Sequence, residues 1–245
     1  MRPFWIALQF LTRLPTPSLT SVTPVESGRS LLFYPLVGLL IGVLLYFVSL
    51  LTTYLSPLLT AAVVVALWLW LTGALHVDGL ADMADGWVGG QGDRERTLAI
   101  MRDPYCGPMG VSAVVALLLL KFAALTVVVT TSPLWLLYAP LAARGMVLLL
   151  MLTTPYCREQ GLASAMLASM PRRGLWAMLA VTGPGGVLIF QWQGLSLLLV
   201  LLLLFWVYRR ALMQRLGGYS GDGAGALLEI SELAVLLVAA VPFNA

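Results

Sequence analysis

Three carboxylates close together in the chain are the residues best suited to chemistry. Asp78, Asp82 and Asp85 lie in segment 73–86, and in a helix their i, i+4, i+7 spacing places them within a sector of about 60° on one face. Because like charges so close repel one another, we expect a cation between them. Mg²⁺ and Mn²⁺ prefer carboxylate oxygens and retain waters that phosphate oxygens can replace. The spacing therefore predicts a Mg²⁺ site for a diphosphate, with these three aspartates as ligands.

Two of the aspartates are also candidate catalytic residues, together with the only histidine in the chain. We assign Asp82, Asp85 and His76 to this group, since a histidine near the cluster could orient a ligand or transfer a proton. Its helical angle places His76 largely off the aspartate face, so a supporting or interfacial role stays open. The alternative for the cluster is a solvated helix end, whose aspartates face water or pair with Arg94 and Arg96. Carboxylates are rare in apolar helices, which favours function.

A turn rich in proline and glycine, residues 101–110, precedes a long apolar run. Such a turn leaves free backbone N–H groups at the start of the following helix, an arrangement that favours phosphate. Arg102 can add a forked contact to phosphate oxygens, and Asp103 could bind metal or hold the arginine. Both are predicted to bind substrate. The alternative is an ordinary turn with a surface ion pair.

Five further ionisable residues are predicted to bind substrate: Lys121, Arg144, Asp222, Glu229 and Glu232. The lysine and Arg144 lie within apolar runs, where an ionisable group is costly and normally faces a polar cavity. Asp222 belongs to a glycine-dense loop that permits close approach of a ligand or another helix, and the two glutamates follow it. Structural pairing of the two cations with the two glutamates is the alternative, and the loop could be a flexible connector.

The composition places these residues in a membrane protein. Of 245 residues 60% are hydrophobic and only 10% charged, which is far from the composition of soluble proteins. The net charge of +3 comes from arginines between apolar runs, as membrane orientation produces, so no nucleic-acid partner is expected. Cys106 and Cys157 are the only cysteines, and both are placed in a reducing compartment. Neither a disulfide nor zinc is expected.

Seven apolar runs predict an all-α, polytopic protein with about seven transmembrane helices in one bundle. The interruption at residues 183–186 and the short sixth run mean that this pair could instead be bent or re-entrant. A single membrane domain, 1–245, is expected. The runs are Leu31–Leu55, Leu58–Leu75, Met109–Thr130, Leu134–Leu152, Leu175–Phe190, Leu195–Tyr208 and Ala226–Val241.

The charged residues fall on alternate connections between these runs. Arginine resists transfer across a membrane and accumulates on the cytoplasmic side. The N-terminus and the three long loops are therefore predicted to be cytoplasmic, with an interfacial segment at 1–30 and a catalytic loop at 76–108. The connectors 56–57, 131–133 and 191–194 carry no charge. The arginines outside the apolar runs are Arg2, Arg13, Arg29, Arg94, Arg96, Arg102, Arg158, Arg172, Arg173, Arg209, Arg210 and Arg215.

Four motifs together resemble the cobalamin synthase family, the adenosylcobinamide-GDP ribazoletransferases, nearly end to end. They are the segment 9–15 (Gln-Phe-Leu-Thr-Arg-Leu-Pro), His76 to Asp82 with Asp85-Gly86, Met101-Arg102-Asp103 with Gly107 and Gly110, and Gly217-Gly218 with Gly221-Asp222 and Glu229. The resemblance implies a Mg²⁺-dependent transfer at the inner membrane, with the active site facing the cytoplasm. Its substrates would be adenosylcobinamide-GDP and α-ribazole or its 5′-phosphate, and its products adenosylcobalamin or its phosphate and GMP. A homo-oligomer in the bilayer is compatible with this expectation.

Two other functions stay open at this point. A CDP-alcohol phosphotransferase of lipid synthesis also uses clustered aspartates, and Asp82 to Gly86 matches the start of its motif, but the residues that should follow are missing. A secondary transporter could use Lys121, Arg144 and the two glutamates as an ion path. No inverted repeat supports transport, and release of GMP by purified protein would separate these functions.

Overall fold

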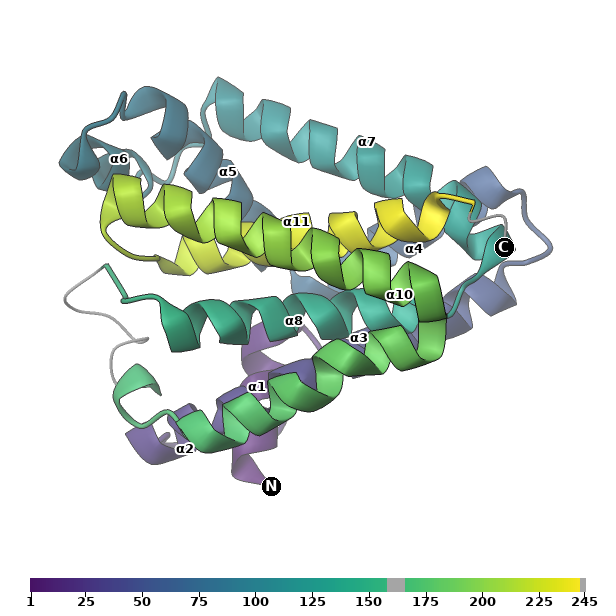
Figure 1. The fold of residues 1–245 in the computed structure, drawn as a ribbon, viewed down its shortest axis with the longest axis horizontal. Coiled ribbons are helices and arrows are strands. Elements are labelled where there is room, and N and C mark those ends of the chain that lie inside the picture. The colour runs from purple at the N-terminus through teal and green to yellow at the C-terminus, as the bar shows by residue number, and fades with distance from the viewer. Residues whose placement is uncertain (158–165, 243–245) are drawn as a thin grey trace.

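The computed structural model describes residues 1–157 and 166–242, and the chain in these ranges forms helices without a β-strand (Figure 1). This confirms the all-α prediction. An isolated bridge joins Tyr156 to Tyr219. The elements are α1 (Arg2–Leu11), α2 (Pro24–Ser30), the 3-10 turn η1 (Leu31–Phe33), α3 (Tyr34–Leu51), α4 (Pro57–Thr72), α5 (Leu75–Gly89), α6 (Arg94–Ile100), α7 (Pro108–Thr131), α8 (Trp135–Thr153), α10 (Arg172–Leu216) and α11 (Gly221–Ala240).

The number of membrane spans is close to the prediction. Five helices in the described ranges are long and apolar enough to cross a bilayer, and the pair α4 and α5 can add a sixth. The backbone of α10 breaks at Gln191 (φ 53, ψ −121), and its two arms diverge from this bend in Figure 1. Seven spans therefore require the two arms of α10 to be counted separately, so seven is an approximate number.

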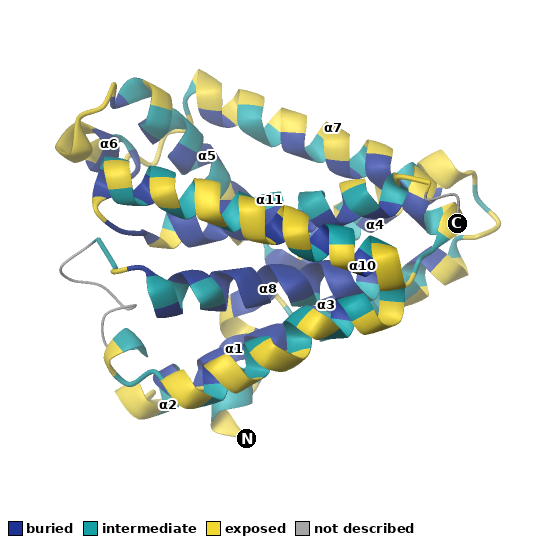
Figure 2. Cartoon of the chain, in the orientation of Figure 1, coloured by how far each residue is buried: buried dark blue, intermediate teal, exposed yellow. Residues whose placement is uncertain are grey.

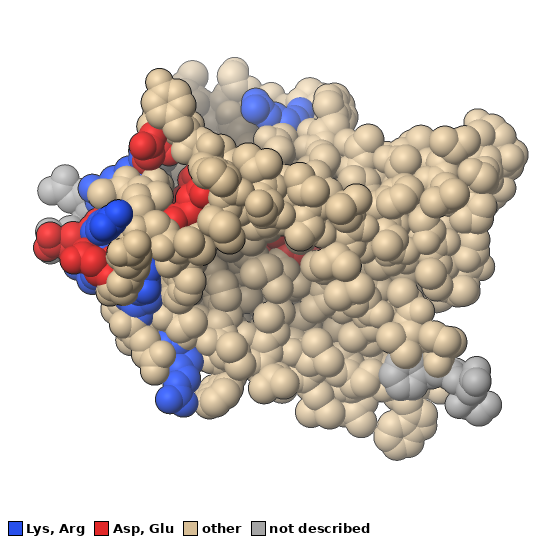
Figure 3. Space-filling model, turned by 90° about the horizontal axis from the view of Figure 1, so that it is seen from above, with Lys and Arg blue, Asp and Glu red and all other residues tan. Residues whose placement is uncertain are grey.

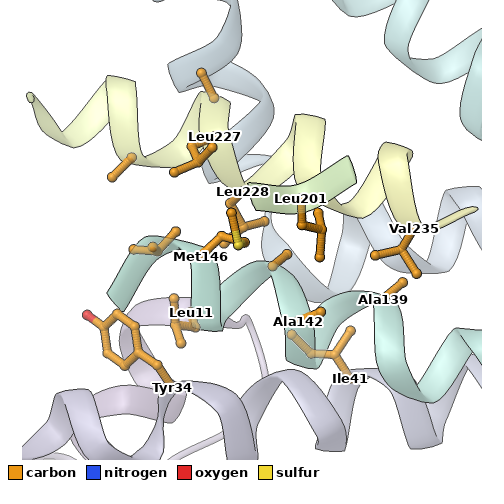
Figure 4. Close-up of a cluster of buried hydrophobic side chains, with 14 of the residues drawn as sticks. Leu11, Tyr34, Ile41, Ala139, Ala142, Met146, Leu201, Leu227, Leu228 and Val235 are labelled. Carbon is orange, nitrogen blue, oxygen red and sulfur yellow. The ribbon is translucent and has the colours of Figure 1, made fainter. Parts of the chain in front are cut away.

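Helix α8 forms the centre of the bundle. Trp135, Leu136, Ala139 and Leu148 are at most 1% exposed, and the helix is largely buried along its length (Figure 2). Side chains of α1 and α3 pack on one side of α8, and side chains of α11 pack on the other (Figure 4). The helices at the periphery, by contrast, expose leucine and valine, as a lipid solvent permits.

A sharp bend separates the aspartates from the preceding span. Helix α4 ends at Thr72, because Gly73 (φ 61) and Ala74 (φ 56) adopt left-handed backbone conformations. Helix α5 then leaves at 88° to α4. The predicted run Leu58–Leu75 extends three residues past the end of α4, and the aspartates occupy a separate helix. The predicted catalytic loop 76–108 contains most of α5, all of α6 and the turn before α7.

Charged side chains gather at the end of the bundle that carries α5 and α6 (Figure 3). The opposite end, at the α3–α4 and α7–α8 connections, carries no charged residue between 52 and 56 or between 132 and 134. This arrangement agrees with the sorting of charges in the sequence. The predicted interfacial segment 1–30 contains α1 and α2, which the ion pair between Arg2 Nη1 and Glu26 Oε1 joins at 3.2 Å. Arg158 lies outside the described residues.

Candidate active site

The three clustered aspartates share helix α5 and approach the turn before α7. Asp78 is exposed, whereas Asp82 and Asp85 are partly buried. The thiol of Cys106 in that turn responds to all three: its pKa is raised by partial removal from water and by the charges of Asp85, Asp82 and Asp78. The Sγ atom lies 3.9 Å from Asp85 Oδ2. The negative charge of the three aspartates therefore reaches the opposite loop.

Asp85, the last of the three aspartates in the sequence, has structural partners that the sequence did not indicate. Asp85 Oδ2 accepts the backbone N–H of Gly107 at 2.7 Å, and its Oδ1 accepts that of Gly110 at 2.9 Å. Gly107 is the N-cap residue of α7 and has no side chain to cap that helix, so Asp85 performs this task from another helix. The expectation that these N–H groups are free for phosphate was wrong for Gly107 and Gly110.

The arginine nearest in sequence does not neutralise the aspartates. Arg94 donates from Nε to the Leu216 carbonyl at 2.8 Å and from Nη2 to the Cys157 carbonyl at 3.2 Å. It thereby fixes α6 to the end of α10. Four ion pairs join described residues, and none of them includes Asp78 or Asp85. The alternative in which Arg94 pairs with the cluster is not the arrangement found.

Two motifs far apart in the sequence meet where α5 packs against α11. A Cβ added to Gly79 would lie 3.0 Å from Asp222 Cα, and one added to Gly225 would lie 3.3 Å from His76 Cα. Only glycine permits this separation without displacing a neighbour. The prediction that the glycine-dense loop allows close approach is confirmed for a helix. The packing places Asp222, in the first turn of α11, beside the start of α5.

A cavity of about 210 Å³ lies at this contact. His76, Asp78 and Asp222 line it, so the structure brings together three of the predicted site residues from two helices. His76 is 6% exposed, and its Nδ1 has no hydrogen-bond partner among the described residues. Asp82, Asp85, Arg102 and Asp103 do not line this cavity.

Sequence reasoning missed one residue of this cavity. Tyr219 is 1% exposed, lines the cavity, and has a hydroxyl without a partner in the described parts of the chain. Its backbone N–H donates to the Pro155 carbonyl and its carbonyl accepts from Cys157 N–H, each at 2.9 Å. These bonds fix the tyrosine between the ends of α8 and α10. The only signal in the sequence was an aromatic residue inside the glycine-dense loop.

The remaining predicted ionisable residues form a buried network deeper in the bundle. Lys121 Nζ lies 2.6 Å from Glu229 Oε2 and 2.7 Å from Glu232 Oε2. Arg144 Nη1 donates to the other oxygen of Glu232, and Lys121 Nζ also lies 4.7 Å from the ring centroid of Trp68. Two cations and two carboxylates balance, and each of the four residues is at most 5% exposed. This is the structural pairing named as the alternative, while their contact with substrate stays a prediction.

Arg102 and Asp103 lie on the exposed turn between α6 and α7. Asp103 Oδ1 accepts the backbone N–H of Tyr105 at 3.0 Å, so this carboxylate stabilises the turn. No ion pair joins it to Arg102 among the pairs found in the described chain. The guanidinium is exposed, close in sequence to the α7 N-terminus that Asp85 caps.

Fold and site together define a multi-pass α-helical membrane protein with an acidic, cavity-containing site at the charged end of its bundle. The chain belongs to the cobalamin-5-phosphate synthase family, which it matches over residues 3–240. Relatives named adenosylcobinamide-GDP ribazoletransferase include those of Pseudomonas paraeruginosa (52% identical, 96% of each chain), Pseudomonas aeruginosa (51%, 98% of each) and Acinetobacter baumannii (45%, covering 99% of this chain and 98% of the relative). No solved structure matches the chain.

Proposed function

We propose that this chain is an adenosylcobinamide-GDP ribazoletransferase of cobalamin biosynthesis. It joins adenosylcobinamide-GDP to α-ribazole or its 5′-phosphate, giving adenosylcobalamin or its phosphate and releasing GMP. The observation that carries this proposal is the meeting of the α5 and α11 motifs, where Asp78, Asp222 and His76 line one cavity. The family match supports the same activity and favours neither lipid phosphotransfer nor transport.

The reaction is a displacement at a diphosphate. The acceptor's hydroxyl oxygen forms a bond to the phosphorus that carries cobinamide, and the bond from that phosphorus to the GMP oxygen breaks. Such a displacement requires in-line placement of the hydroxyl and neutralisation of charge on the leaving group. His76 lines the cavity with an unpartnered ring nitrogen, so it is suited to take the hydroxyl proton. Arg102, on the exposed turn, is suited to contact the phosphates.

The donor atoms near the cavity fit Mg²⁺. No group of three or more His, Cys, Asp or Glu in the described chain is gathered tightly enough to hold a metal by itself. Mg²⁺ usually takes one or two carboxylates and completes its shell with water and substrate phosphates, which matches this arrangement. We assign Asp78 and Asp82 as ligands. Asp85, the third predicted ligand, is already held by two backbone amides, so we assign it to support the site and not to bind the ion. The bound ion would neutralise charge on the diphosphate.

We assign the site to the cytoplasmic face of the inner membrane. Arginine-rich connections mark the cytoplasmic side of membrane proteins, and the α5–α6 end of the bundle carries most of the charged residues (Figure 3). Nucleotide-activated, water-soluble substrates reach a site on this face directly. The bilayer is therefore the environment of the bundle, and the two substrates are its partners.

The test is GMP release by the purified protein in detergent. With adenosylcobinamide-GDP, α-ribazole 5′-phosphate and Mg²⁺, the protein should release GMP and form adenosylcobalamin phosphate in equal amounts. Asp82→Asn should lower the rate at least about 100-fold, as loss of a catalytic electrostatic group does. Glu95→Gln is the matched control, because Glu95 is an exposed carboxylate on α6 outside the cavity. Absence of GMP release by the monodisperse wild type would contradict the proposal.

A further inference from the structure

We propose that the cavity between α5, α8 and α11 binds the bicyclic base of the ribazole acceptor, with the Tyr219 hydroxyl donating to the free ring nitrogen of that base. The inference rests on the proposed function and deepens it, because it assigns one half of the acceptor to a defined place. It also makes the cavity wall the determinant of which base the enzyme accepts.

The cavity has the shape and wall of a site for one apolar ring system. Cavities of about 150 Å³ lined by apolar side chains bind benzene, and this one holds about 210 Å³, enough for a bicyclic ring. It lies well below the roughly 300–1,000 Å³ of sites that enclose whole ligands. Its inner wall comes from several helices and is mostly apolar. That wall includes Leu11, Tyr34, Val147, Met151, Met166 and Leu228.

Two buried polar atoms that belong to cavity-lining residues lack partners, and this second observation indicates a polar ligand. The Tyr219 hydroxyl and His76 Nδ1 are buried without a hydrogen bond to any described residue. Buried polar groups are normally paired, so unpaired atoms on cavity-lining residues are suited to a ligand that supplies the missing partners. A riboside of a benzimidazole-type base offers both kinds of partner: one ring nitrogen that accepts, and ribose hydroxyls that donate.

The position of the carboxylates orients the acceptor. Asp78 and Asp222 line the same cavity, and Asp78 belongs to the helix of the proposed Mg²⁺ ligands. With the base against Tyr219 and Met151, the ribose extends toward His76 and the diphosphate site. The other substrate groups fit less well. A corrin ring exceeds the cavity volume, and guanine would place several amide-type polar groups against aliphatic and thioether side chains.

Tyr219→Phe tests the contact, because it removes only an atom that has no protein partner. We expect the KM for α-ribazole 5′-phosphate to rise about 3- to 10-fold, the value of one neutral hydrogen bond, and the KM for adenosylcobinamide-GDP to stay unchanged. The Tm of the ligand-free protein should stay level or rise. Tyr138→Phe is the matched control: its hydroxyl donates to the Thr182 carbonyl at 3.0 Å away from this cavity. The Tyr138→Phe variant should have a lower Tm and an unchanged KM for α-ribazole 5′-phosphate.

A probe that lacks the ring nitrogen separates this contact from a general packing effect. In the indole analogue of α-ribazole 5′-phosphate a CH group replaces the nitrogen, so the wild type should bind it more weakly than the natural acceptor. Tyr219→Phe should treat the two acceptors alike. An unchanged preference in the variant would overturn the assignment of Tyr219.

Met151→Trp tests the cavity itself, since the larger side chain occupies the space assigned to the base. We expect the acceptor KM to rise at least 10-fold, with an unchanged donor KM and an unchanged Tm. If Met151→Trp keeps the wild-type acceptor KM, or raises only the donor KM, the proposal is overturned. The proposed function still stands in that case if the wild type transfers ribazole. Failure of the wild type to transfer ribazole at all would instead remove the proposed function.

Discussion

The Asp85 carboxylate accepts the backbone N–H of Gly107 at 2.7 Å, across the space between α5 and the start of α7. A second bond from the Gly110 N–H, at 2.9 Å, engages its other oxygen. Asp85, which was predicted as a third metal ligand, therefore connects α5 to the turn that carries Arg102. Its negative charge lies at the positive end of the α7 dipole, where it is stabilising.

Asp85→Asn should therefore affect both stability and rate. The amide retains one acceptor oxygen and places an NH₂ group against a backbone N–H, so we expect a loss of about 1–2 kcal/mol in the free energy of unfolding. The rate should fall because the turn before α7 loses its anchor. Thermal unfolding in detergent and GMP release measure the two effects. An Asp85→Asn protein with wild-type Tm would show that the two hydrogen bonds contribute nothing to stability.

Mg²⁺ dependence should separate the two outer aspartates from Asp85. Asp78→Asn and Asp82→Asn should raise the Mg²⁺ concentration for half-maximal rate at least about 10-fold, as loss of a charged ligand does. The Tm of Asp78→Asn should stay near wild type, because this carboxylate is exposed and forms no ion pair with the described part of the chain. Mg²⁺ titration of the initial rate is the measurement. Unchanged Mg²⁺ titrations with normal activity in both variants would show that the aspartates form a solvated helix end and not a metal site.

The sequence was sufficient for the spans but not for the bends between them. Hydropathy locates α7 and α8 to within a residue or two of their observed ends, because a membrane span is defined by continuous apolar length. The right-angle turn at Gly73 and Ala74 depends on left-handed backbone conformations, and alanine gives no sign of that preference. The reversal at Gln191 was anticipated only as an ambiguity of the fifth and sixth runs.

The sequence indicated the candidate site residues that carry a charge, because charged residues are rare in apolar segments. The pairing of Lys121 with Glu229 and Glu232 was named as an alternative, since buried charges require partners. The role of Asp85 as a cap depends on two N–H groups more than twenty residues away, which no local pattern encodes. Tyr219 carries no charge, so only its burial beside the cavity reveals it.

Membrane topology provides a test that is independent of catalysis. Reporter fusions after residues 57, 133 and 193 should report the outside, because the described chain carries its charged connections at the opposite end of the bundle. A fusion after Gly92, in the exposed connection between α5 and α6, should report the cytoplasm. An outside signal from Gly92 would overturn both the orientation and the assignment of the active site to the cytoplasmic face.

The cations predicted to bind substrate, Arg102, Lys121 and Arg144, should divide into two groups. Arg102 is exposed, so Arg102→Ala should change stability by less than about 0.5 kcal/mol while impairing transfer. A lower kcat would indicate a contact made mainly in the transition state, and a higher KM would indicate equal binding of substrate and transition state. Wild-type kinetics in a well-folded Arg102→Ala protein would exclude this arginine from the phosphate site.

Lys121 should behave in the opposite way, because its ammonium group balances a buried carboxylate. Lys121→Met leaves the network with two glutamates and one arginine, and an uncompensated buried charge costs about 3–5 kcal/mol. Adding Glu229→Gln restores neutrality and should recover much of the Tm. The double variant should then transfer ribazole at a rate close to wild type. If it is stable but inactive, with a raised KM for adenosylcobinamide-GDP, Lys121 contacts the substrate after all and the structural assignment fails.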